Sequence, residues 1–359
     1  MQSEVNGRVC PRFPSMQSIR TRFTEQFNVK LPILNAPMAI PGVAHIASAV
    51  TSNGGFGLVS AAFDGPEGIH ALRNLRRELA IPSDSTIPVG VGFIGWFLDS
   101  FPSEESSARV KAALDEHPAI VWFAFGNDLG KYISLVHEHN AKQKQELKTL
   151  IFVNVNSVPE ALQATKEWKV DGLAVQGIEA GGHGGANAPP LLDLLPAVIS
   201  ALPNGPFILA AGGIATGKQI AAMLVLGADA VVLGTRFLFT NECGWSDQKK
   251  EILVEAEFGS TKRGMMFDDM LKLHDWPEAI NGRAISNGIV RDVEEGLDLE
   301  TRLARYEEGG KKGEKDRVVV WAGVGVGLTK EIKSTAAVVH ELHEDILNAL
   351  RATNQLLSA

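Results

Sequence analysis

The segment Val175-Gln176-Gly177-Ile178-Glu179-Ala180-Gly181-Gly182-His183-Gly184-Gly185 joins the end of an apolar run to a glycine-rich stretch with one histidine. The apolar run, residues 170–175, predicts a buried strand. Because glycine is unfavourable inside helices and strands, we expect a loop to begin near Gly177. Glycines let backbone N–H groups approach a flat or anionic ligand, and a histidine can exchange a proton near neutral pH. A glycine-rich turn with a solvated histidine is the simpler interpretation.

Other apolar runs of similar length flank this segment on both sides. They span residues 31–36, 56–60, 88–93, 119–123, 150–155, 207–211 and 229–233, so the run before the glycines is the sixth of eight. Since these runs are apolar throughout rather than alternating, they predict strands buried on both faces of a parallel sheet. Eight strand-then-helix units predict an α/β fold, a (β/α)8 TIM barrel. An open doubly wound sheet is the alternative, and it fits less well because glycine turns follow strands six, seven and eight rather than strand one.

The sequence pattern changes after the eighth run. Residues 241–314 carry polar helical segments without a clear strand period, and they predict a small, mainly helical domain appended to the barrel. The barrel then comprises residues 16–240 and 315–359. Residues 1–15 are polar and contain arginines but no secretory apolar core, so we expect a disordered N-terminal tail rather than a targeting segment.

Composition limits the class of partner. The chain has 359 residues, of which 45% are hydrophobic and 21% charged, as in ordinary globular proteins. A formal net charge of −8 disfavours nucleic acid or an anionic membrane as the partner. Cys10 and Cys243 cannot form a disulfide framework, and no apolar stretch is long enough to cross a bilayer. We therefore expect a cytoplasmic protein that acts on a small molecule, as a monomer or a homodimer.

The turns after strands seven and eight are suited to binding a phosphate. They read Gly212-Gly213-Ile214 and Leu233-Gly234-Thr235, and Thr216 with Gln219 predicts a capping box for the helix that follows the first turn. In (β/α)8 barrels the active site lies at the C-terminal ends of the strands, and a phosphate often binds at these two turns. Small residues expose backbone N–H groups, and Thr235 adds a hydroxyl donor. Ordinary tight turns are the alternative.

The residues present narrow the choice of a phosphate-bearing group. A pyridoxal cofactor needs a Schiff-base lysine at a strand end, but Lys218 lies within a predicted helix. A purine-nucleotide dehydrogenase needs a nucleophilic cysteine near the sixth strand, whereas Cys243 lies far beyond the eighth. Flavin mononucleotide (FMN), whose own ring carries redox chemistry, remains. Its ring would lie against Ala36, Pro37 and Met38.

Several motifs resemble those of the nitronate monooxygenases, formerly called 2-nitropropane dioxygenases. They are Ser18–Phe23, Ala36–Met38, Gln176–His183, Ala210–Ile214, Leu233–Phe237, Asn281–Ala284 and Ala322–Gly327, and they follow the family's order over residues 16–345. The Glu-Ala-Gly-Gly-His core at residues 179–183 is also found in flavin-dependent enoyl reductases and some quinone reductases.

This resemblance implies an FMN-containing barrel and assigns residues to the cofactor. By motif, the flavin contacts are Gln176, Gly181 and Gly182; the phosphate contacts are Gly212, Gly213, Leu233, Gly234 and Thr235; and Ala36 to Met38 line the ring. Two further cofactor candidates depart from the family pattern. Gly92 stands where many members have asparagine, and Asn154 where many have lysine. Asn154 can still hydrogen-bond the ring edge, whereas a lysine would also stabilise negative charge on reduced flavin.

His183 is the candidate catalytic base or acid. By resemblance, it takes the α-proton of a neutral nitroalkane or orients a nitronate anion by a hydrogen bond. The nitronate then gives an electron to FMN, and reaction with O2 yields a carbonyl compound and nitrite. An FMN-dependent NAD(P)H enoyl or quinone reductase is the nearest alternative. A catalytically inactive barrel that senses a phosphorylated metabolite is a third.

The remaining reactive side chains favour structural interpretations, and we predict no metal site. Histidines and glutamates at helical spacing in residues 340–344 and 137–139 predict solvated helix faces. Trp276 and Trp321 predict packing rather than a substrate platform, and nothing beside Cys243 is basic enough to activate its thiol. The candidates for substrate choice are Gly92, Phe93, Trp96, Phe125 and residues of the small domain.

Overall fold

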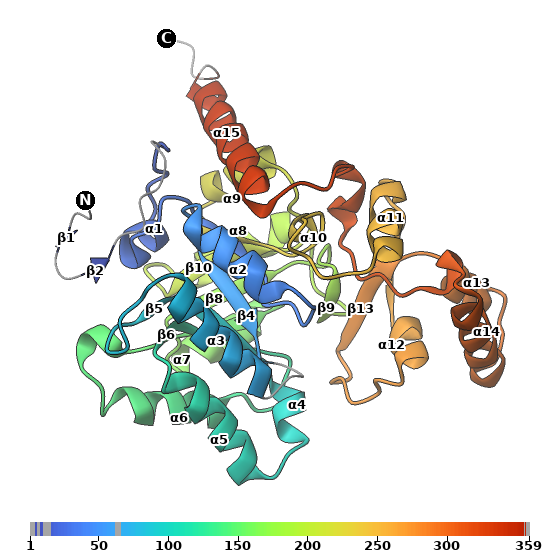
Figure 1. Ribbon diagram of the computed structural model, residues 1–359, viewed down its shortest axis with the longest axis horizontal. Coiled ribbons are helices and arrows are strands. Elements are labelled where there is room, and N and C mark those ends of the chain that lie inside the picture. The colour runs from blue at the N-terminus through green and yellow to red at the C-terminus, as the bar shows by residue number, and fades with distance from the viewer. Residues whose placement is uncertain (1–3, 6–7, 10–15, 62–65, 355, 357–359) are drawn as a thin grey trace.

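The computed structural model describes residues 4–5, 8–9, 16–61, 66–354 and 356. Eight parallel strands form one sheet in the order β3-β11-β10-β8-β7-β6-β5-β4. Their bounds are β3 Ile33–Asn35, β4 Gly57–Ser60, β5 Ile87–Ile94, β6 Pro118–Ala124, β7 Leu150–Val155, β8 Gly172–Gln176, β10 Phe207–Ala211 and β11 Ala230–Leu233. A parallel bridge between Leu34 and Phe56 joins the two edge strands. The sheet therefore closes into the predicted (β/α)8 barrel (Figure 1).

The strands are buried because both faces are covered. Every residue of β4, β6 and β11 is buried, as the uniformly apolar runs predict. Inward side chains such as Leu58, Ile120 and Leu209 fill the barrel interior. Helix α1 (Arg22–Phe27) closes the end at which the strands begin, where Phe23 packs edge-on against Phe56 with 5.5 Å between ring centroids. A cavity lies at the opposite end, where the strands finish.

Helices surround the barrel in sequence order until the eighth position. They are α2 Val43–Ser52, α3 Pro66–Glu78, α4 Gly95–Asp99, α5 Ser103–Leu114, α6 Gly130–Asn140, α7 Val158–Lys166, α8 Leu191–Ala201, α9 Gly217–Val225 and the short α10 Thr235–Leu238. The predicted capping box of Thr216 and Gln219 begins α9. The eighth barrel helix is α15 (Thr335–Asn354), which packs against α9 and α2 after a long insertion.

The insertion lies beside the barrel mouth and has its own small core (Figure 1). It contains α11 Asp247–Glu255, β12 Thr261–Gly264, α12 Met266–Leu271, β13 Ile280–Ile285, α13 Gly288–Glu294 and α14 Leu299–Lys312. The helical character was expected, whereas the two strands were not. Strand β12 is polar apart from its glycine, and the apolar residues of β13 do not alternate with polar ones, so the two strands give no period-two signal. The short helix η3 (Val324–Leu328) leads the chain back towards α15.

Part of the glycine segment is a strand rather than a loop. Residues Gly182–Gly185 form β9, which pairs antiparallel with β13 in a three-stranded sheet with β12. The prediction of a loop throughout this segment was wrong. Glycine disfavours a strand, but β13, about a hundred residues later in the insertion, pairs with residues 182–185 and its hydrogen bonds outweigh that preference.

The N-terminal tail is described only at four residues, where β1 (Glu4–Val5) pairs antiparallel with β2 (Arg8–Val9). The rest of residues 1–15, Cys10 included, lies outside the described residues. Among the helices of the described chain, none is both long and apolar enough to span a membrane.

Candidate active site

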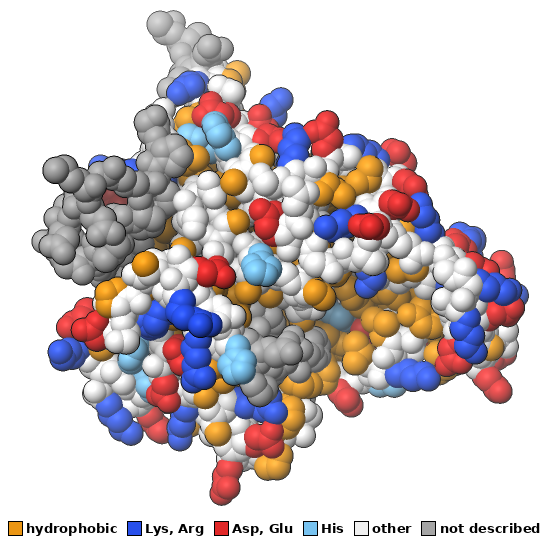
Figure 2. Space-filling view, in the orientation of Figure 1, with side chains coloured by type: hydrophobic (Ala, Val, Ile, Leu, Met, Phe, Trp, Pro, Cys, Tyr) orange, Lys and Arg blue, Asp and Glu red, His pale blue; other side chains and the backbone are white. Residues whose placement is uncertain are grey.

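An open cavity lies at the C-terminal ends of the strands. Ala36, directly after β3, lines its wall, and each of the other seven strands contributes a residue: Ser60, Gly92, Trp122, Asn154, Gln176, Ala211 and Val232. The cavity holds about 950 Å³ of empty space, counting its open mouth. Among the described residues of its wall there is no Lys, Arg, Asp or Glu, and His183 is the one titratable side chain. Figure 2 shows hydrophobic side chains gathered in a hollow beside β13 and α12.

The wall brings together nearly all of the predicted site residues. His183 and the predicted cofactor residues line it, except for Met38, Gly182 and Leu233. Leu233 is fully buried and its carbonyl accepts the Ala36 N–H at 2.9 Å. Met38 lies just behind the wall, with its sulfur 3.8 Å from where a Cβ of Gly234 would stand. These two residues are thus placed to shape the backbone of the site rather than to present side chains to a ligand.

The two glycine turns have conformations that favour glycine. Gly212 has φ +110° and Gly213 has φ +70°, in the left-handed region that L side chains rarely adopt. Gly234 is the N-cap of α10, and Thr235 begins that helix. The Thr235 hydroxyl accepts the Gly323 N–H at 2.9 Å, so it joins the turn after β11 to the glycine segment before η3. Free N–H groups at a helix start and in glycine turns are what a phosphate binds.

The segment at Gly323 was missed as part of the site. Ala322–Gly327 is among the family motifs, but the resemblance assigns these residues no contact with the cofactor. In the structure, Gly323 and Gly325 line the cavity. A Cβ on Gly181 would come within 2.3 Å of the Gly323 nitrogen, so the two glycine segments pack backbone against backbone. A contact between such distant segments leaves no signal in the local spacing of residues.

Side-chain amides form a chain across the floor of the cavity. Asn154 Nδ2 donates to Gln176 Oε1 at 3.2 Å, and Asn156 Nδ2 donates to the same oxygen at 3.0 Å. Gln176 Nε2 in turn donates to the His183 carbonyl at 3.2 Å. The amide of Gln176 is therefore fixed between β7 and β9. Asn156, which sequence reasoning missed, is a buried residue that holds it.

Gly92 departs from the family pattern for a steric reason. A Cβ at this position would lie 2.6 Å from Pro37 Cβ, so an asparagine would require Pro37 to move. Two adjacent walls of the cavity, the end of β5 and the turn after β3, thus approach more closely here than a side chain at residue 92 would allow.

Two arginines from the insertion hold the glycine segment in place. Arg263 donates to the Ala180 carbonyl at 2.6 Å and to the Gly184 carbonyl at 3.3 Å, and Arg283 donates to the Ile178 carbonyl at 3.2 Å. Burial, followed by the neighbouring charge of Arg283, lowers the pKa of Arg263 to about 10. Because these arginines hydrogen-bond to carbonyls along the segment, the insertion fixes the backbone conformation that positions His183.

His183 is held at its edge and on its face. Its Nε2 lies 2.8 Å from Asp268 Oδ1, and its ring stacks on Trp276 with 3.5 Å between centroids and 9° between planes. The ring centroid of Trp321 is 4.8 Å away. The His183 side chain is 12% exposed, so the interpretation as a solvated histidine is wrong. Trp276 and Trp321 pack, as predicted, and what they pack against is this imidazole.

Aromatic residues extend this wall. Phe125 lines the cavity and lies 5.7 Å from Trp276 between ring centroids, while Trp96 lies outside the lining and packs against Trp276 at 5.0 Å. Phe125 has φ +57°, an uncommon conformation for an aromatic residue that is found most often where function requires it. Of the candidates for substrate choice, Gly92, Phe93 and Phe125 face the cavity.

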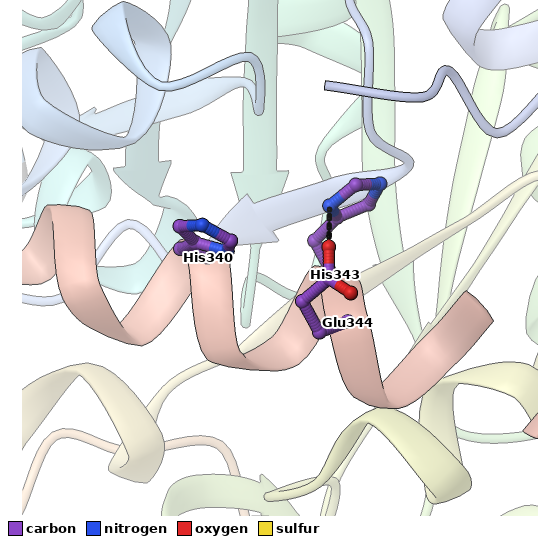
Figure 3. Close-up of side chains that lie close together, drawn as sticks. All are labelled: His340, His343 and Glu344. Atoms are coloured by element: carbon purple, nitrogen blue, oxygen red, sulfur yellow. Dashed lines mark ion pairs between the residues drawn. The ribbon is translucent and has the colours of Figure 1, made fainter. Parts of the chain in front are cut away.

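The other histidines lie away from the cavity. His340, His343 and Glu344 lie close together on α15 (Figure 3). His340 and Glu344 are exposed, as predicted, but His343 is 2% exposed and its Nε2 donates to the Gln17 carbonyl at 2.8 Å. The prediction of a solvated face was therefore wrong for His343, which ties the N-terminal segment to the last helix. Cys243 is buried, and burial raises the pKa of its thiol, which agrees with an unreactive cysteine.

Known proteins resemble this chain over most of its length. The family model for nitronate monooxygenase matches residues 97–345. A nitronate monooxygenase of Neurospora crassa is 30% identical, over 94% of this chain and 96% of that protein. A nitroalkane oxidase from Streptomyces ansochromogenes superposes with a TM-score of 0.74 at 25% identity, over 92% of this chain and 99% of the other. FabK from Thermotoga maritima superposes with a TM-score of 0.75 at 25% identity, over 95% and 100%.

The chain is a (β/α)8 barrel with a glycine-lined cavity at the C-terminal ends of its strands, and it resembles these enzymes over nearly its whole length. It is therefore an oxidoreductase of the flavoprotein class. Within that class, the chain belongs to the nitronate monooxygenase family. The resemblance that the sequence motifs indicate is confirmed.

Proposed function

We propose that this enzyme uses FMN and O2 to oxidise alkyl nitronates, and nitroalkanes after removal of their α-proton, to a carbonyl compound and nitrite. The observation that supports this most is the cavity itself. It lies where the barrel strands end, its described lining residues include no Lys, Arg, Asp or Glu, and its one titratable side chain there is a largely buried imidazole held against Asp268 and Trp276. An active site for carbon acids needs little more than a base, a redox ring and a dry cavity.

The residues present fit a flavin nucleotide. Left-handed Gly212 and Gly213 and the start of α10 offer backbone N–H groups for the phosphate. A Cβ on Gly234 would make only ordinary van der Waals contacts, at 3.8 Å from Ala36 and Met38. Gln176 and Asn154 present amide groups towards the cavity for the ring edge. Ala36 and Pro37 offer a flat apolar surface for the ring.

When bound, FMN would supply the redox chemistry that links oxidation of the nitronate to reduction of O2. The chain's own residues do the rest. Trp276 and the β9–β13 pairing keep the His183 ring at the cavity wall, where it accepts the α-proton of a nitroalkane. Phe93, Phe125 and Trp122 exclude water from the reacting carbon. A base in this position contributes about 10²–10⁴-fold to the rate.

Anaerobic reduction tests the proposal. The purified yellow protein is mixed without O2 with ethyl nitronate, NADH or NADPH, and the flavin absorbance is followed. We expect the nitronate to bleach the flavin and the nicotinamides to leave it oxidised. Bleaching by NADH or NADPH alone would establish the alternative, a nicotinamide-dependent reductase, and protein that is colourless after gentle purification would support the sensor.

The uncharged wall also predicts which nitronates react. A substrate carboxylate in this cavity would face no Lys or Arg among the described lining residues, and an unpaired charge loses several kcal/mol on burial. We therefore expect kcat/KM for ethyl or butyl nitronate to exceed that for propionate-3-nitronate by about tenfold or more, which corresponds to about 1.4 kcal/mol.

Asn154→Lys tests whether the missing positive charge causes this preference. It adds a cation where the wall carries an amide, so the preference against the carboxylate should shrink or reverse. Asn154→Met is the matched control, since it has similar length without charge, and it should leave the preference as in the wild type. Equal turnover of both nitronates by the wild type would contradict the prediction.

A further inference from the structure

Asp268 is a buried carboxylate with an incomplete set of hydrogen bonds. It lies in the first turn of α12, its side chain is 0% exposed, and Oδ1 is 2.8 Å from His183 Nε2. Its second oxygen, Oδ2, is buried and has no hydrogen-bond partner among the described residues. A buried carboxylate oxygen without a partner costs folding free energy. A residue kept for fold stability alone would not be expected to have this arrangement.

The hydrogen bond fixes where the imidazole carries its proton. An ionised carboxylate can only accept, so Nε2 of His183 must be the N–H that donates to Asp268. In the neutral ring, the lone pair is then on Nδ1, for which the described residues supply no hydrogen-bond partner. Stacking on Trp276 at 9° keeps the ring in one plane, so Nε2 stays directed at Asp268.

We infer that Asp268 is a positioning residue that makes Nδ1 of His183 the proton acceptor. This inference rests on the proposed function. Asp268 does not line the cavity, so it acts through His183 rather than on the substrate. In the step, the α C–H bond of the nitroalkane breaks, an Nδ1–H bond forms, and the electron pair of the C–H bond moves onto the nitro group to give the nitronate. The resulting imidazolium is stabilised by the buried carboxylate.

Asp268→Asn tests the inference because it changes hydrogen bonding with almost no change in shape. The amide of asparagine can donate to Nε2, which favours the tautomer with its proton on Nδ1 and removes the acceptor. We expect kcat/KM for neutral nitroethane to fall about 10²-fold or more. Turnover of preformed ethyl nitronate should fall far less, because no proton has to be removed.

Asp269→Asn is the matched control. This neighbouring carboxylate pairs with Arg302 at 3.2 Å and is partly exposed, so its loss should leave the ratio of nitroalkane to nitronate turnover unchanged. Both variants are measured as holoenzymes beside His183→Asn. If His183→Asn loses nitroalkane turnover selectively and Asp268→Asn does not, the inference about Asp268 fails while the proposed function stands. If His183→Asn itself shows no selectivity, the proposed base role fails.

A second measurement does not depend on how Asp268→Asn folds. In wild-type holoenzyme labelled with 15N-histidine, the His183 signals are those lost in His183→Asn, and 15N shifts distinguish a protonated ring nitrogen from an unprotonated one. We expect neutral His183 to be protonated at Nε2. Protonation at Nδ1 instead, or equal loss of both activities in a folded Asp268→Asn, would overturn the inference.

Discussion

Replacing His183 by asparagine is expected to cut kcat/KM for neutral nitroalkanes by about 10²–10⁴-fold, the usual contribution of a general base. Oxidation of preformed nitronates should fall far less, since the carbanion already exists in solution. The reason is the isolation of His183: among the described residues of the cavity wall, no other side chain can accept a proton at neutral pH. Steady-state rates with nitroethane and with ethyl nitronate, on the same flavin-loaded preparation, measure both effects.

His340→Asn is the appropriate control for this variant. His340 is exposed on α15, outside the cavity, so the same chemical change there should leave both rates at the wild-type level. An equal loss with nitroalkane and nitronate in His183→Asn would contradict the base role. It would indicate that the ring mainly supports Trp276 or the flavin.

The barrel was predictable because its signals are local. A strand covered on both faces must be apolar along its whole length, and each such run can be identified without knowing its neighbours. The turns at Gly212 and Gly234 were predictable for a similar reason, since the rule that sites occur at C-terminal strand ends converts chain order into position. The sequence motifs predict one site for His183, Gln176 and the glycines, and in the structure His183, Gln176 and the predicted glycines other than Gly182 line one cavity.

The surroundings of His183 were not predictable, because they come from distant parts of the chain. Asp268 is 85 residues further on, in a segment whose sequence shows only polar helical patterning. Strand β13 pairs Gly282 with His183, and a Cβ on Gly282 would lie 2.3 Å from Trp321. Nothing in the spacing of Asp268 separates it from an ordinary surface residue, and the motif at Asn281–Ala284 does not indicate that Gly282 pairs with His183. Both contacts depend on the pairing of β9 with β13.

The same limit explains the error at His343. The helical period places His340, His343 and Glu344 on one side of α15, and charged helix faces are usually solvated. The prediction lacked the N-terminal segment, whose Gln17 carbonyl covers His343 in the fold. Period indicates which residues share a face, but burial depends on which other segment packs there.

Gly234→Asp is expected to give a folded protein that has lost its flavin. Gly234 has φ −97° and ψ −79°, and the nearest atoms to a Cβ there would be 3.8 Å away, so a side chain fits. Aspartate is a better N-cap than glycine, so the carboxylate should bind the N–H groups at the start of α10. Those are the groups proposed to hold the phosphate. Competition and like-charge repulsion of several kcal/mol should weaken FMN binding by about 10²-fold or more.

Gly234→Asn separates charge from size. Asparagine is nearly the same shape and caps a helix as well as aspartate does, but it carries no charge. If the turn after β11 binds the phosphate, the asparagine variant should retain substantially more FMN than the aspartate variant when both are titrated with FMN by fluorescence quenching. Both should unfold at or above the wild-type apoprotein temperature. Similar FMN affinity in the two variants would mean that the phosphate lies elsewhere, because a buried phosphate beside Gly234 must distinguish an anion from its neutral isostere.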